Sequence, residues 1–274
     1  MNNPAFVHNP DSVLFITLDS CRYDTFRRLM PPNICDVGSL SKAMSPSYFT
    51  YGSHAAMFMG FLPSIYKQLR FKNSKYSKLF RLAHAGFSGR ESEGFVMDGP
   101  SIIAGFSKRG YRCIGSGAAG WFDPNTETGA VLSKDFDSFF YPGEVWELSR
   151  QLEWLDKQII QTAYPEKPIF VFLNIGETHV PYWHEGALWD RNDNPCIPFQ
   201  KLNRRRDCRL RQRACLSYVD KLLAPLLEAF QQATIVVTAD HGDCWGEDGL
   251  WEHGISHQRT LEVPLLIRYK GVPM

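Results

Sequence analysis

The sequence predicts an α/β fold with a largely parallel central sheet flanked by helices. Short apolar runs rich in β-branched residues recur along the chain, and longer segments with the apolar spacing of helices lie between them. Several of the runs are apolar at successive positions, as strands are when both faces of their sheet are covered. Because 44% of the 274 residues are hydrophobic, we expect a core large enough for a single domain over residues 1–274.

Strands and helices are expected in turn along the chain. The expected strands are apolar runs at 12–18, 111–115, 168–174, 235–237 and 263–268. The expected helices begin near Tyr23 and near Thr50, the latter stopped by Gly60 and Pro63, and cover 101–109, 146–160 and 204–230. Residues 115–120 are rich in Gly and predict a flexible loop. Residues 66–99 and 183–213 are interpreted as excursions over the substrate entrance.

Composition excludes several classes of protein. A formal net charge of +1 argues against a nucleic-acid partner, and the Arg-rich stretch at 204–213 is interpreted as a solvated helix face. The 7 cysteines lack paired spacing, which favours reduced thiols. There is no pattern of a secretory leader, and no apolar run approaches the ~20 residues of a membrane helix. We therefore expect a cytoplasmic protein with no membrane partner.

Polar side chains follow the ends of three expected strands. Asp19 follows the first strand, Glu177 and His179 follow the strand at 168–174, and Asp240 and His241 follow the strand at 235–237. The carboxyl ends of parallel strands meet at one edge of the sheet, where ligands bind. Carboxylate and imidazole ligands favour one or two Zn²⁺ or Mn²⁺ ions. The local alternatives are a helix cap at Asp19 and a turn with a solvated His241.

A hydroxyl-rich segment precedes the helix that ends at Gly60. Thr50 and Ser53 lie at its start, where free backbone N–H groups and the helix dipole favour an anion. The same field lowers the cost of forming an alkoxide, and an adjacent metal would favour it further. The alternative is that these hydroxyls only cap the helix.

The order of these motifs resembles the alkaline phosphatase superfamily, on its sulfatase-like branch. The resemblance runs from about Val13 to Ile267. It rests on a strand ending in Asp19, a hydroxyl before Ala-Ala-Met-Phe-Met-Gly60-Phe-Leu-Pro63, Thr-His179-Val-Pro, Ala-Asp240-His241-Gly, and Trp-Glu-His253-Gly. The chain is short for that superfamily, so a minimal version lacking the C-terminal subdomain is expected.

The resemblance implies a role for each matching residue. Asp19, Asp240 and His241 would hold a metal ion beside Thr50, which stands at the nucleophile position and would itself be a ligand. Ser53 is the alternative nucleophile. The resemblance assigns a second ion or the substrate to His179 and His253. Further candidates for substrate contact or for support of the ligands are Glu177, His54, His257 and Arg22.

Departures from the sulfatase pattern favour phosphorus chemistry. Sulfatases carry Cys, matured to formylglycine, where this chain has Thr50, and Arg where it has His54. Ala118 and Gly120 stand where sulfatases supply Lys and His. We therefore predict a hydrolase or transferase acting on a small anionic phosphate ester (monoester, diester or phosphonate ester) through a phospho-threonine. The alternatives are a sulfate-ester hydrolase, a phosphomutase, or a non-catalytic binding relative; the oligomeric state is left open.

Overall fold

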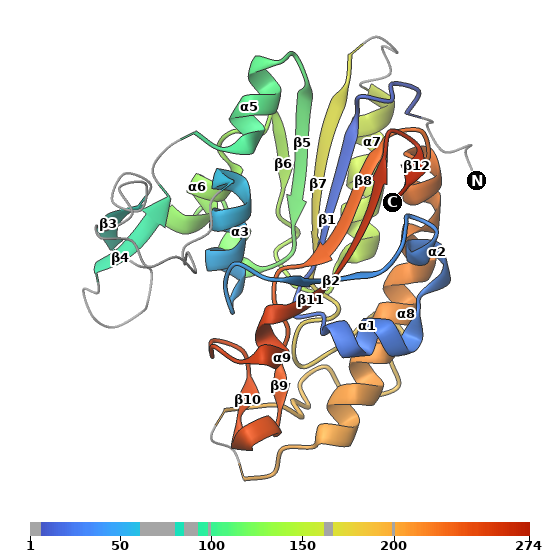
Figure 1. Cartoon of the computed structure of the whole chain (residues 1–274). Helices are drawn as coiled ribbons and strands as arrows, with labels where there is room; N and C mark the ends of the chain where they lie inside the picture. The colour runs from blue at the N-terminus through green and yellow to red at the C-terminus, as the bar shows by residue number, and fades with distance from the viewer. Residues whose placement is uncertain (1–6, 61–79, 85–92, 98–99, 162–166, 199–200) are drawn as a thin grey trace, which may run out of the picture.

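A central mixed sheet organises the chain, as Figure 1 shows. The computed structural model describes residues 7–60, 80–84, 93–97, 100–161, 167–198 and 201–274. Within these residues the central sheet has 8 strands. In spatial order they are β12 (Val272–Pro273), β11 (Glu262–Tyr269), β8 (Thr234–Ala239), β1 (Val13–Leu18), β7 (Ile169–Ile175), β5 (Arg112–Gly117) and β6 (Ser138–Phe140), with β2 (Ser41–Met44) paired to β11.

The middle of this sheet is parallel, as the sequence predicts. Strands β8, β1, β7, β5 and β6 run parallel to one another, while β11 pairs antiparallel with β8, β2 and β12. All side chains of β7 are buried, which explains its unbroken apolar run. The α/β prediction is confirmed.

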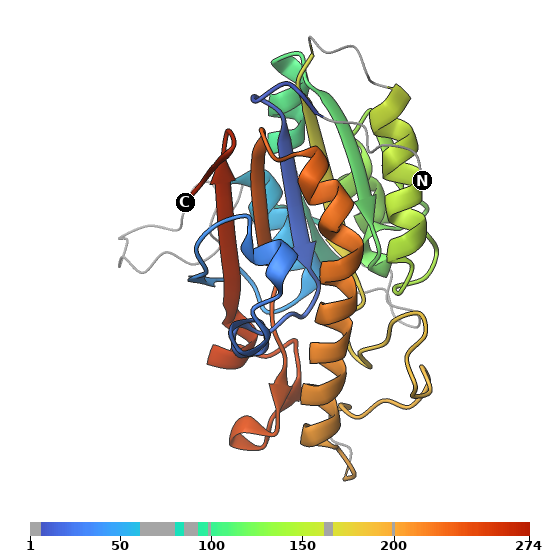
Figure 2. The ribbon, with the colours of Figure 1, turned by 90° about the vertical axis from the view of Figure 1, so that its right-hand side faces the viewer.

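Helices cover both faces of the sheet (Figures 1 and 2). The helices α7 (Leu148–Gln161) and α8 (Arg205–Ala229) pack on one face, with α1 (Tyr23–Leu29) and α2 (Pro32–Cys35) beside α8. The helices α3 (Thr50–Met59), α5 (Ile102–Lys108) and α6 (Glu127–Ser133) pack on the other. The chain therefore forms three layers, with the sheet in the middle.

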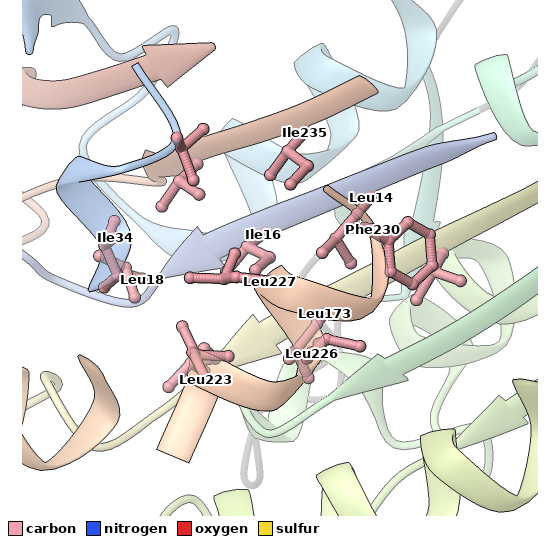
Figure 3. Close-up of a cluster of buried hydrophobic side chains, with 14 of the residues drawn as sticks. Leu14, Ile16, Leu18, Ile34, Leu173, Leu223, Leu226, Leu227, Phe230 and Ile235 are labelled. Atoms are coloured by element: carbon pink, nitrogen blue, oxygen red, sulfur yellow. The ribbon is translucent and has the colours of Figure 1, made fainter. Parts of the chain in front are cut away.

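The core is built on the alternation of side chains along β1. Leu14, Ile16 and Leu18 point to the α8 side, where Leu223 and Leu227 meet them, as Figure 3 shows. The buried apolar residues of α8 recur three or four positions apart, so one stripe of the helix faces the sheet. No described helix is both long enough and apolar enough to cross a lipid bilayer.

The expected loop at 115–120 is wrong in its first half. Strand β5 continues to Gly117, and the amide oxygen of Asn174 accepts hydrogen bonds from the N–H groups of Ala118 and Ala119, each at 3.2 Å. Asn174 lies on the neighbouring strand β7, so a contact from outside the segment orders this Gly-rich stretch.

Several short elements were not expected from the sequence. Among them are β9 (Cys244–Trp245), β10 (Trp251–Glu252), α9 (Gln258–Leu261), and the 3₁₀ turns η1 (Gly120–Phe122) and η2 (Glu247–Gly249). The elements α2, β2, α6, β6 and β12 were not expected either. Most of the excursion at 66–99 lies outside the described residues, which contain only its paired strands β3 (Phe80–His84) and β4 (Glu93–Met97). In the excursion at 183–213, helix α8 begins at Arg205. The single-domain organisation stays a prediction.

The parallel register brings the strand ends together. Leu18, the last residue of β1, pairs with Ile175 of β7 and with Ala239 of β8. The next residue of each strand therefore lies at the same edge, and the N–H of Asp19 still bonds to the carbonyl of Ile175 at 2.8 Å. This register places Asp19 beside Asp240.

Candidate metal centre

Two carboxylates and one imidazole meet at this edge of the sheet. Nε2 of His241 lies 3.6 Å from Oδ1 of Asp19 and 3.6 Å from Oδ2 of Asp240. All three side chains are fully buried, and their candidate ligand atoms lie within 4.8 Å of one another. The hydroxyl of Thr50 is 3.3 Å from the same Nε2. Four expected residues thus share one buried site.

The donor atoms of this cluster fit a cation. Oδ2 of Asp19 and Oδ2 of Asp240 are buried and have no hydrogen-bond partner among the described residues, although buried carboxylate oxygens normally have one. Nδ1 of His241 lies 3.1 Å from the carbonyl of Gly242, so it carries the proton and leaves the Nε2 lone pair facing the carboxylates. Two oxygens, one nitrogen and a hydroxyl suit Zn²⁺ or Mn²⁺.

Burial shifts the protonation of all three groups in the metal-free protein. It raises the pKa of Asp240 to about 7, and together with the charge of Asp240 it raises the pKa of Asp19 to about 6. Burial also lowers the pKa of His241 to about 4, so its imidazole is neutral at physiological pH. A divalent cation would replace protons on the two carboxylates.

We expect metal affinity to depend steeply on pH. At pH 5 a cation must displace a proton from Asp19, whose pKa is about 6, and another from Asp240, whose pKa is about 7; at pH 8 both are ionised. The Kd for Zn²⁺ should therefore be larger at pH 5 than at pH 8 by about 10²- to 10³-fold. Competition titrations with a zinc indicator at both values measure this. A Kd that is the same at both would contradict protonated carboxylates.

Asp240 is held in place by its neighbours. Its Oδ1 accepts from the N–H groups of Ser20 at 3.1 Å and His241 at 2.9 Å, which leaves Oδ2 toward the cluster. Its carbonyl oxygen accepts from the hydroxyls of Ser45 and Ser53, the latter at 2.7 Å. Ser53, the alternative nucleophile from the sequence, thus has its proton directed at a backbone carbonyl behind the cluster.

Thr50 is the first residue of α3, and His54 contacts its backbone carbonyl one helical turn later. Nδ1 of His54 lies 2.7 Å from the carbonyl oxygen of Thr50, and its Nε2 lies 2.9 Å from the hydroxyl of Thr17. The ring packs edge-on against Phe122 and Phe172, and burial lowers the pKa of His54 to about 3. His54 is therefore a neutral support for Thr50 within the core, which is the second of the two roles expected from the sequence.

Two further imidazoles adjoin the cluster of Asp19, Asp240 and His241. The ring of His253 lies 4.4 Å from that of His241 and 5.1 Å from that of His179, measured between centroids. Nδ1 of His253 lies 2.8 Å from Oδ1 of Asp243, and Nδ1 of His179 lies 2.7 Å from the carbonyl of Val180. In both, Nε2 is the nitrogen left for a second ion or a substrate.

The sequence interpretation did not include Asp243 in the site. It is fully buried, and with His241 and His253 it forms a second group whose candidate ligand atoms lie within 4.8 Å. Burial opposes the charge of His253, but the hydrogen bond and the charge of Asp243 outweigh it and raise the pKa of His253 to about 9. Its position in the sequence, three residues after Asp240 and ten before His253, is the signal that could have indicated Asp243 as a site residue.

A family model matches most of the chain. The model described as Sulfatase matches residues 50–273, which is more than half of the chain. The chain belongs to the sulfatase family. The resemblance inferred from the motifs is confirmed, while the role of Thr50 is not decided by the match. No curated protein matches this sulfatase-family chain.

Solved structures share the fold. A protein of the alkaline phosphatase superfamily from Vibrio parahaemolyticus has a TM-score of 0.57 at 15% identity, covering 99% of this chain and 63% of that protein. The periplasmic domain of EcEptC from Escherichia coli, in complex with Zn, has a TM-score of 0.62 at 12% identity, covering 95% of this chain and 73% of that domain. Lipooligosaccharide phosphoethanolamine transferase A from Neisseria meningitidis has a TM-score of 0.60 at 13% identity, covering 96% of this chain and 48% of that protein. The chain thus spans under two thirds of the first and third.

In this sulfatase-family chain Arg22 supports the site instead of facing a substrate. The side chain is buried, and its guanidinium binds Asp24 at 2.8 Å, Glu247 at 3.0 Å and the carbonyl of Asp243 at 3.1 Å. It also stacks on the ring of Trp245 at 4.0 Å. These contacts hold the turn that follows Asp240, so of the two roles expected for Arg22 the structure favours support of the ligands.

Glu177 and His257 belong to helix caps. Oε1 of Glu177 accepts from the N–H of Leu148 at 2.9 Å, at the start of α7, and burial raises its pKa to about 7. Nδ1 of His257 accepts from the N–H of Arg259 at 2.9 Å in α9, and its Nε2 lies 3.2 Å from Asp248. Neither belongs to the two metal-ligand groups found among the described residues.

Proposed function

We propose that this sulfatase-family chain is a metal-dependent hydrolase or transferase of phosphate esters, with Thr50 as its nucleophile. One observation carries the proposal. The hydroxyl of Thr50 lies at the N-terminus of α3, 3.3 Å from Nε2 of His241, in the group that contains the two unpartnered carboxylate oxygens. A nucleophile, a cation site and a helix N-terminus therefore coincide.

The residues that would hold the metal follow from the geometry. Asp19, Thr50, Asp240 and His241 would bind one Zn²⁺ or Mn²⁺ ion. His179 and His253 would face a second ion or the substrate through Nε2. A bound ion would polarise the phosphoryl group and lower the pKa of the adjacent hydroxyl.

The chain's own groups account for the covalent chemistry. Oγ1 of Thr50 gives up its proton and attacks phosphorus in line, and a P–O bond forms to threonine. The P–O bond to the ester oxygen breaks, and the leaving group takes up a proton and departs as the alcohol. The N–H groups in the first turn of α3 stabilise negative charge on the phosphoryl oxygens. Water then hydrolyses the phospho-threonine, or an acceptor alcohol takes the phosphoryl group, and Thr50 is regenerated.

The nucleophile type favours phosphate over sulfate esters. The formylglycine of sulfatases arises from Cys, and this chain has Thr50 at that position. Thr50 therefore matches a phospho-enzyme better than a sulfatase. The fold shared with a phosphoethanolamine transferase supports transfer as well as hydrolysis. The substrate would be a small anionic ester, with no membrane or nucleic-acid partner. All 7 cysteines are unpaired, which supports the cytoplasm as the proposed compartment.

A panel of nitrophenyl esters tests this proposal. Metal-free protein reconstituted with Zn²⁺ or Mn²⁺ is assayed on a phosphomonoester, a phosphodiester, a phosphonate ester and a sulfate ester. We expect kcat/KM for at least one phosphorus ester to exceed that for the sulfate ester by about 10²-fold or more. Faster sulfate cleavage would overturn the assignment, and metal binding without any turnover would support a binding protein.

A further inference from the structure

We propose that Asp243 is a positioning residue that fixes the ring proton of His253 on Nδ1 and so keeps Nε2 available at the site. The inference rests on the proposed function only for the use of Nε2. It distinguishes two roles for Asp243, which lies close enough to His241 and His253 to be a third metal ligand. The surrounding hydrogen bonds decide between these roles.

A chain of hydrogen bonds leads from the core to His253. Nε1 of Trp245 donates to the hydroxyl oxygen of Tyr182 at 2.7 Å, and that hydroxyl donates to Oδ2 of Asp243 at 2.7 Å. Oδ1 of Asp243 lies 2.8 Å from Nδ1 of His253. Trp245, Tyr182 and Asp243 are at most 1% exposed, so water does not compete for these groups.

The direction of this chain follows from the donors. An indole N–H can only donate, so the oxygen of Tyr182 must accept from Trp245. The single hydroxyl proton of Tyr182 then points to Asp243, whose ionised carboxylate can only accept. Nδ1 of His253 must therefore carry a proton, and a neutral His253 has its lone pair on Nε2.

The same contacts argue against Asp243 as a metal ligand. One of its carboxylate oxygens accepts from Tyr182 and the other from His253. Its carbonyl accepts from Arg22, which also stacks on Trp245, so backbone and side chain are fixed together. In contrast, Asp19 and Asp240 each keep one buried oxygen that has no partner in the part of the chain that the structure describes.

Replacing Asp243 with Asn is expected to reverse the direction of the hydrogen bond between residue 243 and His253. The amide oxygen must face the hydroxyl of Tyr182, so the amide NH₂ faces Nδ1 of His253. His253 then holds its proton on Nε2 and loses the lone pair there. In the double variant Asp243→Asn/Tyr182→Phe the amide is free to turn its oxygen to His253, which restores the Nδ1–H form. Asp243→Asn/Trp245→Phe provides a second route, because Tyr182 is then free to accept from the amide.

The test combines nitrogen NMR with kinetics. Two-bond ¹H–¹⁵N spectra of ¹⁵N-histidine-labelled, zinc-loaded protein report which nitrogen of His253 is protonated, with His253→Asn for assignment. At a pH high enough for His253 to be neutral, we expect Nδ1–H alone in the wild type, Nε2–H in Asp243→Asn, and Nδ1–H again in both double variants. Activity on the preferred phosphorus ester should fall about 10- to 100-fold in Asp243→Asn and recover by about 5-fold or more in the double variants.

Asp220→Asn is the matched control. Asp220 is 2% exposed and accepts from the N–H of Ile34 at 2.9 Å and from Asn33 at 2.9 Å, so the change also removes a buried carboxylate, but one that contacts α2. We expect no change in the His253 tautomer and less than about 3-fold change in activity, because the hydrogen bonds of Asp220 lead to Asn33 and Ile34 in α2.

Two outcomes would overturn the inference. An unchanged Nδ1–H signal in Asp243→Asn is one. The other is a pair of double variants that regain the Nδ1–H form and yet stay as inactive as Asp243→Asn, which would assign Asp243 to direct ligation. Failure of the proposed function is separate: full activity of His253→Asn would remove His253 from the reaction, while the NMR result would still test Asp243.

Discussion

Replacing Thr50 with Ala is expected to reduce turnover of the preferred phosphorus ester by about 10⁴- to 10⁶-fold, the size of effect seen when a nucleophile is removed. The metal should remain, because Asp19, Asp240 and His241 still supply two oxygens and one nitrogen. Steady-state kinetics and zinc analysis of the same preparation measure both quantities.

Ser53→Ala is the matched control for Thr50→Ala. Both residues are hydroxyl-bearing and buried in α3, but the hydroxyl of Ser53 donates to the carbonyl of Asp240 at 2.7 Å. Its loss should cost about 0.5–1.5 kcal/mol of stability and change turnover by less than about 10-fold. Equal loss of turnover in the two variants would contradict the distinction, and near-normal activity of Thr50→Ala would transfer the nucleophile role elsewhere.

Replacing Asp19 with Asn is expected to weaken metal binding by about 10³-fold or more and to abolish turnover, since an amide is a far poorer ligand than a carboxylate. The metal-free variant should nevertheless be more stable than metal-free wild type at pH 8. The folded-state pKa of Asp19 is raised to about 6 by burial and by Asp240, so stability from this group is lost as the pH rises through that value.

Thermal unfolding at pH 8 without metal measures this gain. Removing one of the two buried charges should raise the Tm by about 2–6 °C. Asp220→Asn, which removes a buried carboxylate that accepts two hydrogen bonds, should lower it. A lower Tm for Asp19→Asn, together with unchanged zinc affinity, would show that Asp19 is a structural residue and not a ligand.

The sequence predicts the central strands because their patterns depend on local properties. Strands β1, β7 and β8 are short apolar runs, and a parallel sheet with both faces covered needs such runs. The same argument predicts that Asp19, Asp240 and His241 meet, because residues after parallel strands share one edge. Thr50 is predictable as a hydroxyl at the start of a helix.

Other parts of the site depend on contacts between distant segments. His54, Arg22 and His257 are site candidates by residue type, but the structure gives them support and capping roles through Thr17, Glu247 and Asp248. The chain from Trp245 through Tyr182 to Asp243 joins residues 63 and 61 positions apart. Sequence patterns within one segment do not contain that information.

The most direct measurement is a crystal structure of zinc-loaded protein with vanadate, which imitates a phosphoryl group in transfer. We expect zinc to be held by Asp19, Asp240 and His241, and vanadium to be bonded to Oγ1 of Thr50 at the N-terminus of α3. A vanadium atom facing Ser53 or a water, with Thr50 turned away from it, would contradict the central claim.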